Sequence, residues 1–237
     1  MLELENVVVR FGGVRPLDDL SVRLAGRMQG LIGPNGAGKT TLLNVVSGFV
    51  APASGRLAMD GSSLTGLAPG ERARRGVRRT FQSERLAENL CAWDNVMVMA
   101  DASERRGRRA GVVRDACALV GLRHPDRPAR ALDGLDRKLC ELARALVGRP
   151  RVVLLDEPAG GLGEAEVGHV RDVLLAVQAQ GDTAVVVVDH DVELISTICD
   201  SVAVLDYGRL LASGPCETVL NDERVREAWL GKAAVTT

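Results

Sequence analysis

A glycine-rich segment between a strand pattern and a helix pattern constrains the fold of this chain more than any other feature. Residues 33–41 read Gly-Pro-Asn-Gly-Ala-Gly-Lys-Thr-Thr, which fits the spacing G-x-x-x-x-G-K-[ST]. Met28 to Ile32 leads into it as a predicted strand, and apolar residues recur at helical spacing from Leu42 to Phe49. Together these patterns predict a loop that wraps around a phosphate group at the start of a helix.

The chemistry of this loop follows from its residue types. Glycines let the backbone approach phosphate closely, and successive N–H groups form a nest for an anion. The N-terminus of the following helix adds a partial positive charge. We expect Lys39 to reach the outer phosphates and the Thr40 hydroxyl to ligate Mg²⁺. The alternative, a glycine-rich turn with a solvated lysine, does not account for the flanking strand and helix patterns.

A second apolar strand pattern ends in two carboxylates. Val152 to Leu155 is followed directly by Asp156 and Glu157. In a parallel sheet the C-terminal ends of the strands face the ligand crevice, so Asp156 is expected near the Mg²⁺. Glu157 is placed to orient or deprotonate an attacking water. The alternative is a pair of capping residues at a strand exit, which the nearby phosphate loop makes the weaker interpretation.

Two further polar residues follow strand patterns. His190 comes shortly after the apolar run Ala184 to Val188, and Gln82 directly follows Val77 to Phe81. We expect both to join the same crevice, where Gln82 could reach Mg²⁺ or water. Taken alone, each has an ordinary alternative: a histidine packed at a helix start, and a plain amide on a surface loop. The residues by themselves leave these alternatives open.

The fold class follows from the order of the apolar runs. In the last third of the chain, short all-apolar strands alternate with helical patterns. Such alternation predicts an α/β fold with a largely parallel sheet covered by helices on both faces. One further helix is expected after Pro215. The segment 83–132 differs in composition and is expected to form a small helical insertion.

Composition excludes several classes of protein. The 237 residues carry 30 basic and 31 acidic side chains, so a dedicated nucleic-acid binder is disfavoured. No apolar run approaches the ~18 residues of a membrane span. The five cysteines are scattered without paired spacing, as in proteins of a reduced cytosol.

Arginine is concentrated in two segments. The first contains Arg72, Arg74, Arg75, Arg78 and Arg79, and the second contains Arg105, Arg106, Arg108 and Arg109. We expect these runs to be solvated faces, balanced by acidic residues elsewhere. The alternative is that they bind a phosphate-rich partner or the membrane surface.

The ordered set of motifs resembles a known family. Residues 33–41, Gln82, Asp156-Glu157 and His190 occur in the order found in the ATP-binding subunits of ABC transporters. The resemblance is strongest to the branch that imports branched-chain amino acids and urea. It covers nearly the whole chain and also rests on Arg10-Phe11-Gly12-Gly13, Val46-Ser47-Gly48-Phe49, Arg79-Thr80-Phe81-Gln82 and Leu142-Ala143-Arg144-Ala145-Leu146.

The resemblance implies a single P-loop NTPase domain of the ABC ATPase type. Its expected parts are a mixed, mostly parallel sheet, an N-terminal antiparallel β portion and a small helical subdomain. Residues 1–82 and 133–237 would form the nucleotide-binding core, and residues 83–132 the helical subdomain, with the signature segment at its end.

The implied activity is ATP hydrolysis that powers import across a membrane. The expected cofactors are ATP and Mg²⁺. The expected partners are a second ATPase subunit, permease subunits and, indirectly, a substrate-binding protein, with the chain held by its permease at the cytoplasmic face of the cell membrane. Glu157, His190 and Gln82 would be catalytic, and Thr40, Gln82 and Asp156 would hold the metal. The nucleotide would be bound by Phe11, whose ring stacks on adenine, and by Asn35, Gly36, Ala37, Gly38, Lys39, Thr40 and Thr41.

The signature segment departs from the family pattern. The usual L-S-G-G-Q falls on residues 132–136, where Asp133 replaces the serine and Leu135 replaces the second glycine. In the family these two positions approach the γ-phosphate in the partner's site. The departure predicts that the site which this chain completes on its partner hydrolyses ATP poorly, which favours a heterodimer.

The sequence leaves two alternatives to the importer ATPase. The first is an ATP-binding regulatory subunit with little hydrolysis of its own, which the altered signature favours and the intact Glu157 and His190 oppose. The second is a soluble ABC ATPase of nucleic-acid repair or translation. Such proteins usually carry two cassettes or long coiled coils in one chain, and this sequence contains neither.

Overall fold

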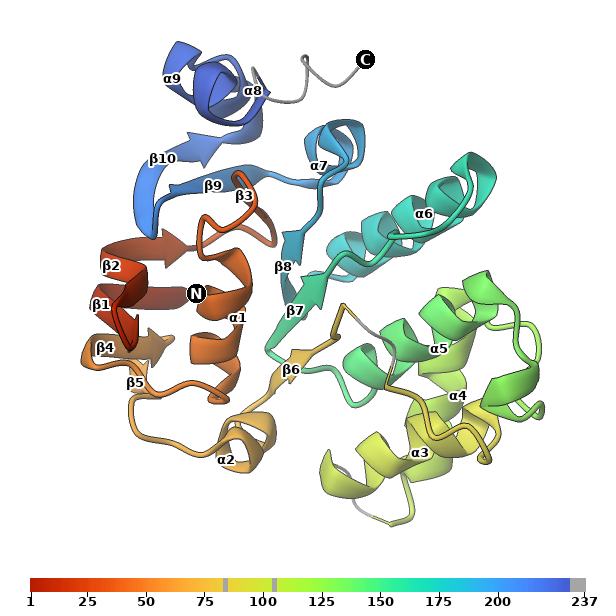
Figure 1. Cartoon of the computed structure of the whole chain (residues 1–237). Coiled ribbons are helices and arrows are strands. Elements are labelled where there is room, and N and C mark those ends of the chain that lie inside the picture. The colour runs from red at the N-terminus through yellow and green to blue at the C-terminus, as the bar shows by residue number, and fades with distance from the viewer. Residues whose placement is uncertain (83–84, 104–105, 231–237) are drawn as a thin grey trace. The chain divides into compact units, whose positions relative to one another are not determined.

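The computed structural model describes residues 1–82, 85–103 and 106–230 (Figure 1). Contacts divide the chain into two units. The first unit comprises Met1–Ala73 and Val186–Thr237, and the second comprises Arg74–Val185. The second unit is therefore inserted in the sequence of the first.

An antiparallel sheet forms the N-terminal part of the first unit. Its strands are β1 (Leu2–Phe11), β2 (Val14–Leu24), β4 (Ser54–Met59) and β5 (Ser62–Ser63), in the order β2-β1-β4-β5. Every pair of neighbouring strands is antiparallel. The alternating apolar residues bury one face, as the period-2 pattern requires. This sheet confirms the predicted N-terminal antiparallel β portion.

A second sheet of the first unit positions the glycine-rich loop. Strand β3 (Met28–Ile32) pairs in parallel with β9 (Ser201–Asp206), and β9 forms an antiparallel hairpin with β10 (Arg209–Pro215). Strand β8 (Ala184–Val188) spans the boundary between the two units in the sequence. All five residues of β3 are buried, including Gln29, whose Oε1 accepts a hydrogen bond from the Ser201 hydroxyl.

Helices of the first unit follow the strands. They are α1 (Lys39–Ser47), α2 (Pro69–Arg74) and α7 (Val192–Ile198), followed by α8 (Cys216–Leu220) and α9 (Glu223–Val225). The predicted helix after Pro215 is present as α8, which ends at its C-cap Asn221. Asp222 begins the next helix by accepting a hydrogen bond from the backbone N–H of Arg224, and a π-helical turn, Arg226–Leu230, follows.

The second unit combines two parallel strands with a group of helices. Strand β6 (Val77–Arg79) pairs in parallel with β7 (Val152–Asp156). The helices are α3 (Ala92–Ser103), α4 (Arg109–Val120), α5 (Gly134–Leu146) and α6 (Glu164–Gln180), with a short 3-10 turn at Ala129–Ala131. Helices α3, α4 and α5 contact one another (Figure 1).

The described part of the predicted helical segment contains α3 and α4. Residues 83 and 84, where this segment was predicted to begin, lie outside the described residues. The division into a core and a helical subdomain stays a prediction.

The arginine segments differ from the prediction of solvated faces. Arg72 and Arg78 are only 2% and 6% exposed. Arg72 donates hydrogen bonds to the carbonyl groups of Leu67, Val45 and Val46. The last carbonyl groups of α1 lack helical partners, so a buried guanidinium is well placed there.

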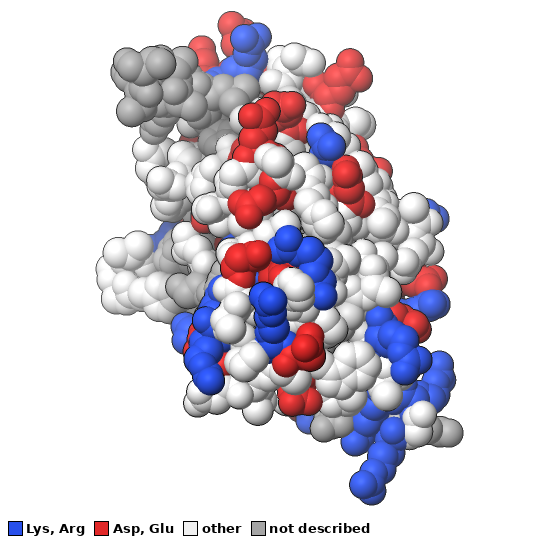
Figure 2. Space-filling view, turned by 90° about the vertical axis from the view of Figure 1, so that its right-hand side faces the viewer, with Lys and Arg blue, Asp and Glu red and all other residues white. Residues whose placement is uncertain are grey.

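Other arginines of the two segments are exposed as predicted, among them Arg74, Arg75, Arg106 and Arg108. Arg105 lies outside the described residues. On the face in Figure 2, acidic and basic side chains are interspersed over much of the surface, and basic ones gather at its lower right edge.

Candidate functional site

The glycine-rich loop connects β3 to α1 in the first unit. Helix α1 begins at Lys39, and its N-cap Gly38 has a left-handed backbone and offers no side-chain cap. The Lys39 side chain is only 7% exposed, and its Nζ donates to the carbonyl oxygens of Gly33 (2.6 Å) and Pro34 (3.0 Å). The alternative of a solvated lysine was therefore wrong. Thr40 is exposed beside it.

Close packing explains why this loop requires glycine. A Cβ atom on Gly33 would lie 2.1 Å from the carbonyl oxygen of Leu205, and one on Gly38 would lie 2.3 Å from that of Pro16. The loop is also held by a hydrogen bond of 3.0 Å from the N–H of Gly208 to the carbonyl of Ala37. Buried lysine, a helix N-terminus without a side-chain cap and exposed loop backbone together form a donor set that fits a polyphosphate.

This packing predicts unequal effects of two alanine substitutions in the loop. Gly33→Ala should lower the free energy of unfolding by roughly 3 kcal/mol, since overpacking adds to the strain of its φ of 144°. Gly36→Ala should cost only about 1 kcal/mol, because its φ is 81° but nothing lies within 4 Å of the new Cβ. Urea unfolding of both variants measures the difference. Equal losses of stability would contradict the packing argument.

Two other predicted residues belong to the first unit. Phe11 ends β1 and is 55% exposed, so its ring face is available for stacking. His190 is also exposed, and its backbone N–H donates to Asp189 Oδ1 at 2.7 Å. The same oxygen accepts from the N–H of Asp191 at 3.1 Å, and Asp191 caps α7. His190 is thus not packed in the core. The nucleotide and catalytic roles of both residues stay predictions.

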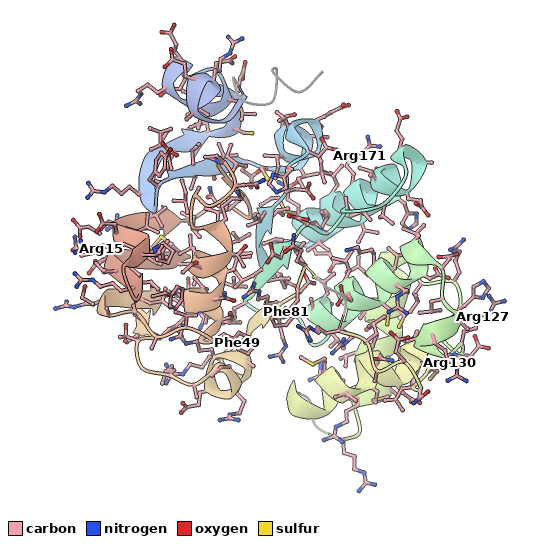
Figure 3. All side chains as sticks on the ribbon, in the orientation of Figure 1. Arg15, Phe49, Phe81, Arg127, Arg130 and Arg171 are labelled. Atoms are coloured by element: carbon pink, nitrogen blue, oxygen red, sulfur yellow. The ribbon has the colours of Figure 1, made fainter. Side chains whose placement is uncertain are left out.

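In the second unit Asp156 is held by an arginine that the motif analysis did not identify. Arg79 Nη2 lies 3.1 Å from Asp156 Oδ2, and the two side chains are 5% and 4% exposed. Burial lowers the pKa of Arg79, and the hydrogen bond and charge of Asp156 oppose that shift. The guanidinium also lies over the ring of Phe81, 4.8 Å from its centroid. Phe81 is labelled in Figure 3.

The other carboxylate, Glu157, lies beside Gln82. Gln82 Nε2 is 3.3 Å from Glu157 Oε1 and 3.4 Å from Oε2. Glu157 has a left-handed φ of 52°, a strain that non-glycine residues sustain mainly where the surroundings enforce it, as at functional sites. Gln82 is exposed, as a plain loop residue would be, yet it contacts the carboxylate with which it was predicted to act.

The altered signature segment forms the start of α5. Asp133 is the N-cap, and its Oδ1 accepts from the backbone N–H of Asp136 at 2.8 Å. Its Oδ2 lies 2.8 Å from Arg123 Nη2, and Arg123 Nε lies 3.1 Å from the buried Asp136 Oδ1. The backbone hydrogen bond, followed by the charge of Arg123, lowers the pKa of Asp133. Arg123 was not predicted, because nothing in the motif itself points to a residue ten positions upstream.

The described residues contain neither a metal-binding cluster of side chains nor a helix that could cross a membrane. No group of three or more His, Cys, Asp or Glu side chains there is arranged to hold a metal ion. None of the helices in the described ranges is both long enough and apolar enough to cross a membrane.

Comparison with known proteins places these features in a family. The family model described as "ABC transporter" matches residues 17–160, and the one described as "Branched-chain amino acid ATP-binding cassette transporter" matches residues 209–235. The chain is 32% identical over 251 residues to the high-affinity branched-chain amino acid transport ATP-binding protein LivG of Salmonella typhimurium, with 98% of each chain covered.

Two further similarities extend over almost the full length. The lipopolysaccharide export system ATP-binding protein LptB of Escherichia coli K12 is 31% identical over 98% of this chain and 97% of its own. The crystal structure of the ADP conformation of MJ1267, an ATP-binding cassette of an ABC transporter, superposes with a TM-score of 0.85 and 26% identity, covering 98% of both chains. The predicted α/β P-loop NTPase fold is thereby confirmed. This chain belongs to the ATP-binding subunits of ABC transporters, which are ATPases coupled to transport.

Proposed function

We propose that this chain binds and hydrolyses ATP to power an importer of branched-chain or other amino acids, or of urea. The observation that carries this proposal is the match of residues 209–235 to the cassettes of branched-chain amino acid transporters. The identity to LivG over nearly the whole chain supports it. The chain would then act at the cytoplasmic face of the membrane, on permease subunits that receive substrate from a binding protein.

The nucleotide would be bound by residues of the first unit. The Phe11 ring would stack on the adenine, and residues 35–41 would surround the phosphates. Lys39 would exchange its two loop carbonyl partners for phosphate oxygens. Thr40 and Asp156, with Gln82, would hold Mg²⁺, whose charge offsets that of the phosphate oxygens when it is bound.

Hydrolysis would depend on Glu157. Its carboxylate would accept the proton of the attacking water, a general-base role. Gln82 would orient that carboxylate, as its present contact with both oxygens suggests. His190 would contact the γ-phosphate from the turn that Asp189 holds.

The altered signature makes the two ATP sites of the assembly unequal. In the family, the corresponding serine and glycine approach the γ-phosphate bound to the partner subunit. Here Asp133 and Asp136 share the single guanidinium of Arg123, which can balance only one of the two carboxylates. A carboxylate ~4 Å from a phosphate charge is repelled by up to ~4 kcal/mol at an effective dielectric constant of 20. A partner subunit with an ordinary signature would keep one site active, so a heterodimer is favoured.

A double substitution tests this asymmetry. Asp133→Ser with Leu135→Gly should speed hydrolysis at the repaired site about tenfold or more, because ~1.4 kcal/mol of recovered stabilisation is already a factor of ten. Since the other site is already active, total ATP turnover of the assembled transporter should then rise by up to about twofold. Serine is also a good N-cap, so α5 should still begin at the same residue. Asp126→Ser, which removes an exposed carboxylate from the same unit, is the matched control. Unaltered turnover in the double variant would show that the signature does not limit hydrolysis.

The importer itself is tested on the purified complex. The chain should co-purify with permease subunits and with a second, different ATPase subunit. Reconstituted in vesicles, the complex should accumulate labelled leucine, isoleucine or urea only when ATP is supplied on the ATPase side. Transport of none of these solutes would reject the importer proposal.

Comparing ATPase rates separates the importer from its alternative. A motor subunit should hydrolyse ATP faster in the assembled complex than alone. A regulatory subunit would bind ATP equally well but would hydrolyse it slowly in both states.

A further inference from the structure

A cavity of about 340 Å³ lies within the second unit, between the start of α4, the end of α5 and the end of α6. None of the residues that line it belongs to the predicted nucleotide site or the signature segment. Its volume lies in the range of small-molecule pockets. We propose that this cavity binds a small zwitterion with an apolar body, namely an α-amino acid with an apolar side chain.

The first argument is the pair of opposite charges that line the cavity. Arg108 and Asp115 both face it from α4. Within the described part of the chain, neither forms an ion pair or a side-chain hydrogen bond. Their positions differ by seven residues, or about two helical turns, so they share one side of α4. The long arginine side chain can bridge most of that distance, so one amino acid can meet both groups.

A second pair of opposite charges, Arg149 and Asp182, forms an ion pair at the rim of the cavity. Arg149 Nη1 lies 3.0 Å from Asp182 Oδ2, which ties the chain after α5 to the chain after α6. Arg149 has a left-handed φ of 52°, and the preceding Gly148 also has a positive φ. Such strain in a non-glycine residue persists where its surroundings enforce it, as at ligand sites.

The ends of three helices add partial positive and partial negative charges to the lining of the cavity. The N-cap of α4 is Arg108, which provides no side-chain cap, so the first N–H groups of α4 favour a carboxylate. Helices α5 and α6 end at Leu146 and Gln180, and both residues line the cavity. Their last carbonyl groups carry a partial negative charge that favours an ammonium group.

Apolar side chains form the wall between these charged groups. Val112, Ala116, Leu119, Leu146 and Val177 line the cavity. Three of them, Ala116, Leu146 and Val177, are buried in the core of the unit. A ligand with two opposite charges and an aliphatic side chain satisfies both the charged lining and this wall, whereas a simple anion or cation satisfies only part of it.

Titration of the purified full-length chain without nucleotide tests the proposal, with L-leucine as the probe. Calorimetry should show one site with a dissociation constant on the order of 0.1–1 mM, as a ligand of this size allows. 4-Methylpentanoate, which lacks the amino group, and 3-methylbutylamine, which lacks the carboxylate, should each bind about tenfold more weakly or worse. Equal binding of all three compounds, or no binding of leucine, would overturn the proposal.

Substitutions of the lining residues test whether leucine binds in this cavity. Arg108→Gln and Asp115→Asn should each weaken leucine binding about tenfold, and Val112→Phe should abolish it by filling the cavity. Arg114→Gln, which removes an exposed arginine of the same helix outside the cavity lining, should leave it unchanged. Leucine binding that survives Val112→Phe would place the ligand elsewhere and overturn the assignment.

This inference concerns a ligand of the class that the proposed importer carries, but binding is measured without nucleotide, permease or transport. Failure to bind leucine would therefore leave the proposed ATPase function untouched. Conversely, if the chain binds leucine in this cavity but powers no transport, the cavity assignment stands and the importer proposal is rejected.

Discussion

Replacing Glu157 by glutamine is expected to lower ATP hydrolysis by the assembled transporter by about 10²- to 10⁴-fold, the range that general-base catalysis contributes. The amide has nearly the same shape as the carboxylate but cannot accept the proton of the attacking water. The two side chains have similar size, so the left-handed backbone at this residue should be preserved. Release of inorganic phosphate measures the loss.

Binding of ATP by this variant should be unchanged, which separates a catalytic role from a structural one. Lys39 and residues 35–41 are unaltered, so the equilibrium affinity for the nucleotide should stay within a factor of about two. Glu164→Gln, which removes an exposed carboxylate from the first turn of α6, is the control and should hydrolyse ATP normally. Hydrolysis at the wild-type rate in Glu157→Gln would remove Glu157 from the proposed mechanism.

The features that sequence analysis predicted correctly are local ones. The loop at residues 33–41 could be identified because its glycines, Lys39 and the flanking strand and helix are contiguous in the chain. The buried strands β7 and β8 were evident from unbroken apolar runs, since a strand buried on both faces has no polar side. Each of these patterns depends on the geometry of one element and not on its neighbours.

The features that were missed depend on pairing between distant segments. Arg79 and Asp156 end neighbouring parallel strands, yet 77 positions separate them in the sequence. Arg123 reaches the start of α5 from beyond a loop, so no spacing rule relates it to Asp133. Arg72 was expected to be solvated because composition cannot show that the end of α1 needs a hydrogen-bond donor.

These missed contacts change the interpretation of two predicted residues, Asp133 and Asp156. Asp133 was recognised as a departure from the family pattern, but its ion pair with Arg123 determines how far its negative charge is balanced. Asp156 was predicted to be a metal ligand, but a buried arginine already balances its carboxylate. Breaking a buried pair by removing one partner typically costs about 3–5 kcal/mol, so Arg79 is a structural requirement for the site.

Lys39→Ala should weaken ATP binding about 10²- to 10⁴-fold. The variant loses two charge-assisted hydrogen bonds to phosphate oxygens, each worth about 1.5–3 kcal/mol, and a tenfold change corresponds to about 1.4 kcal/mol. In the present structure Lys39 Nζ donates to the carbonyl oxygens of Gly33 and Pro34. The substitution therefore also removes two contacts that hold the loop, so affinity has to be measured together with the unfolding temperature.

The control for Lys39→Ala is Arg27→Ala, which removes an exposed cation from the same unit and should leave the affinity for ATP unchanged. If Lys39→Ala remains folded and binds ATP weakly while Arg27→Ala binds normally, the loss is specific to the glycine-rich loop. A folded Lys39→Ala protein with undiminished affinity would mean that the nucleotide is held elsewhere. In that case the roles proposed for Thr40, Asp156 and Glu157 would be rejected as well, because each role requires the residue to lie near the phosphates that Lys39 is proposed to bind.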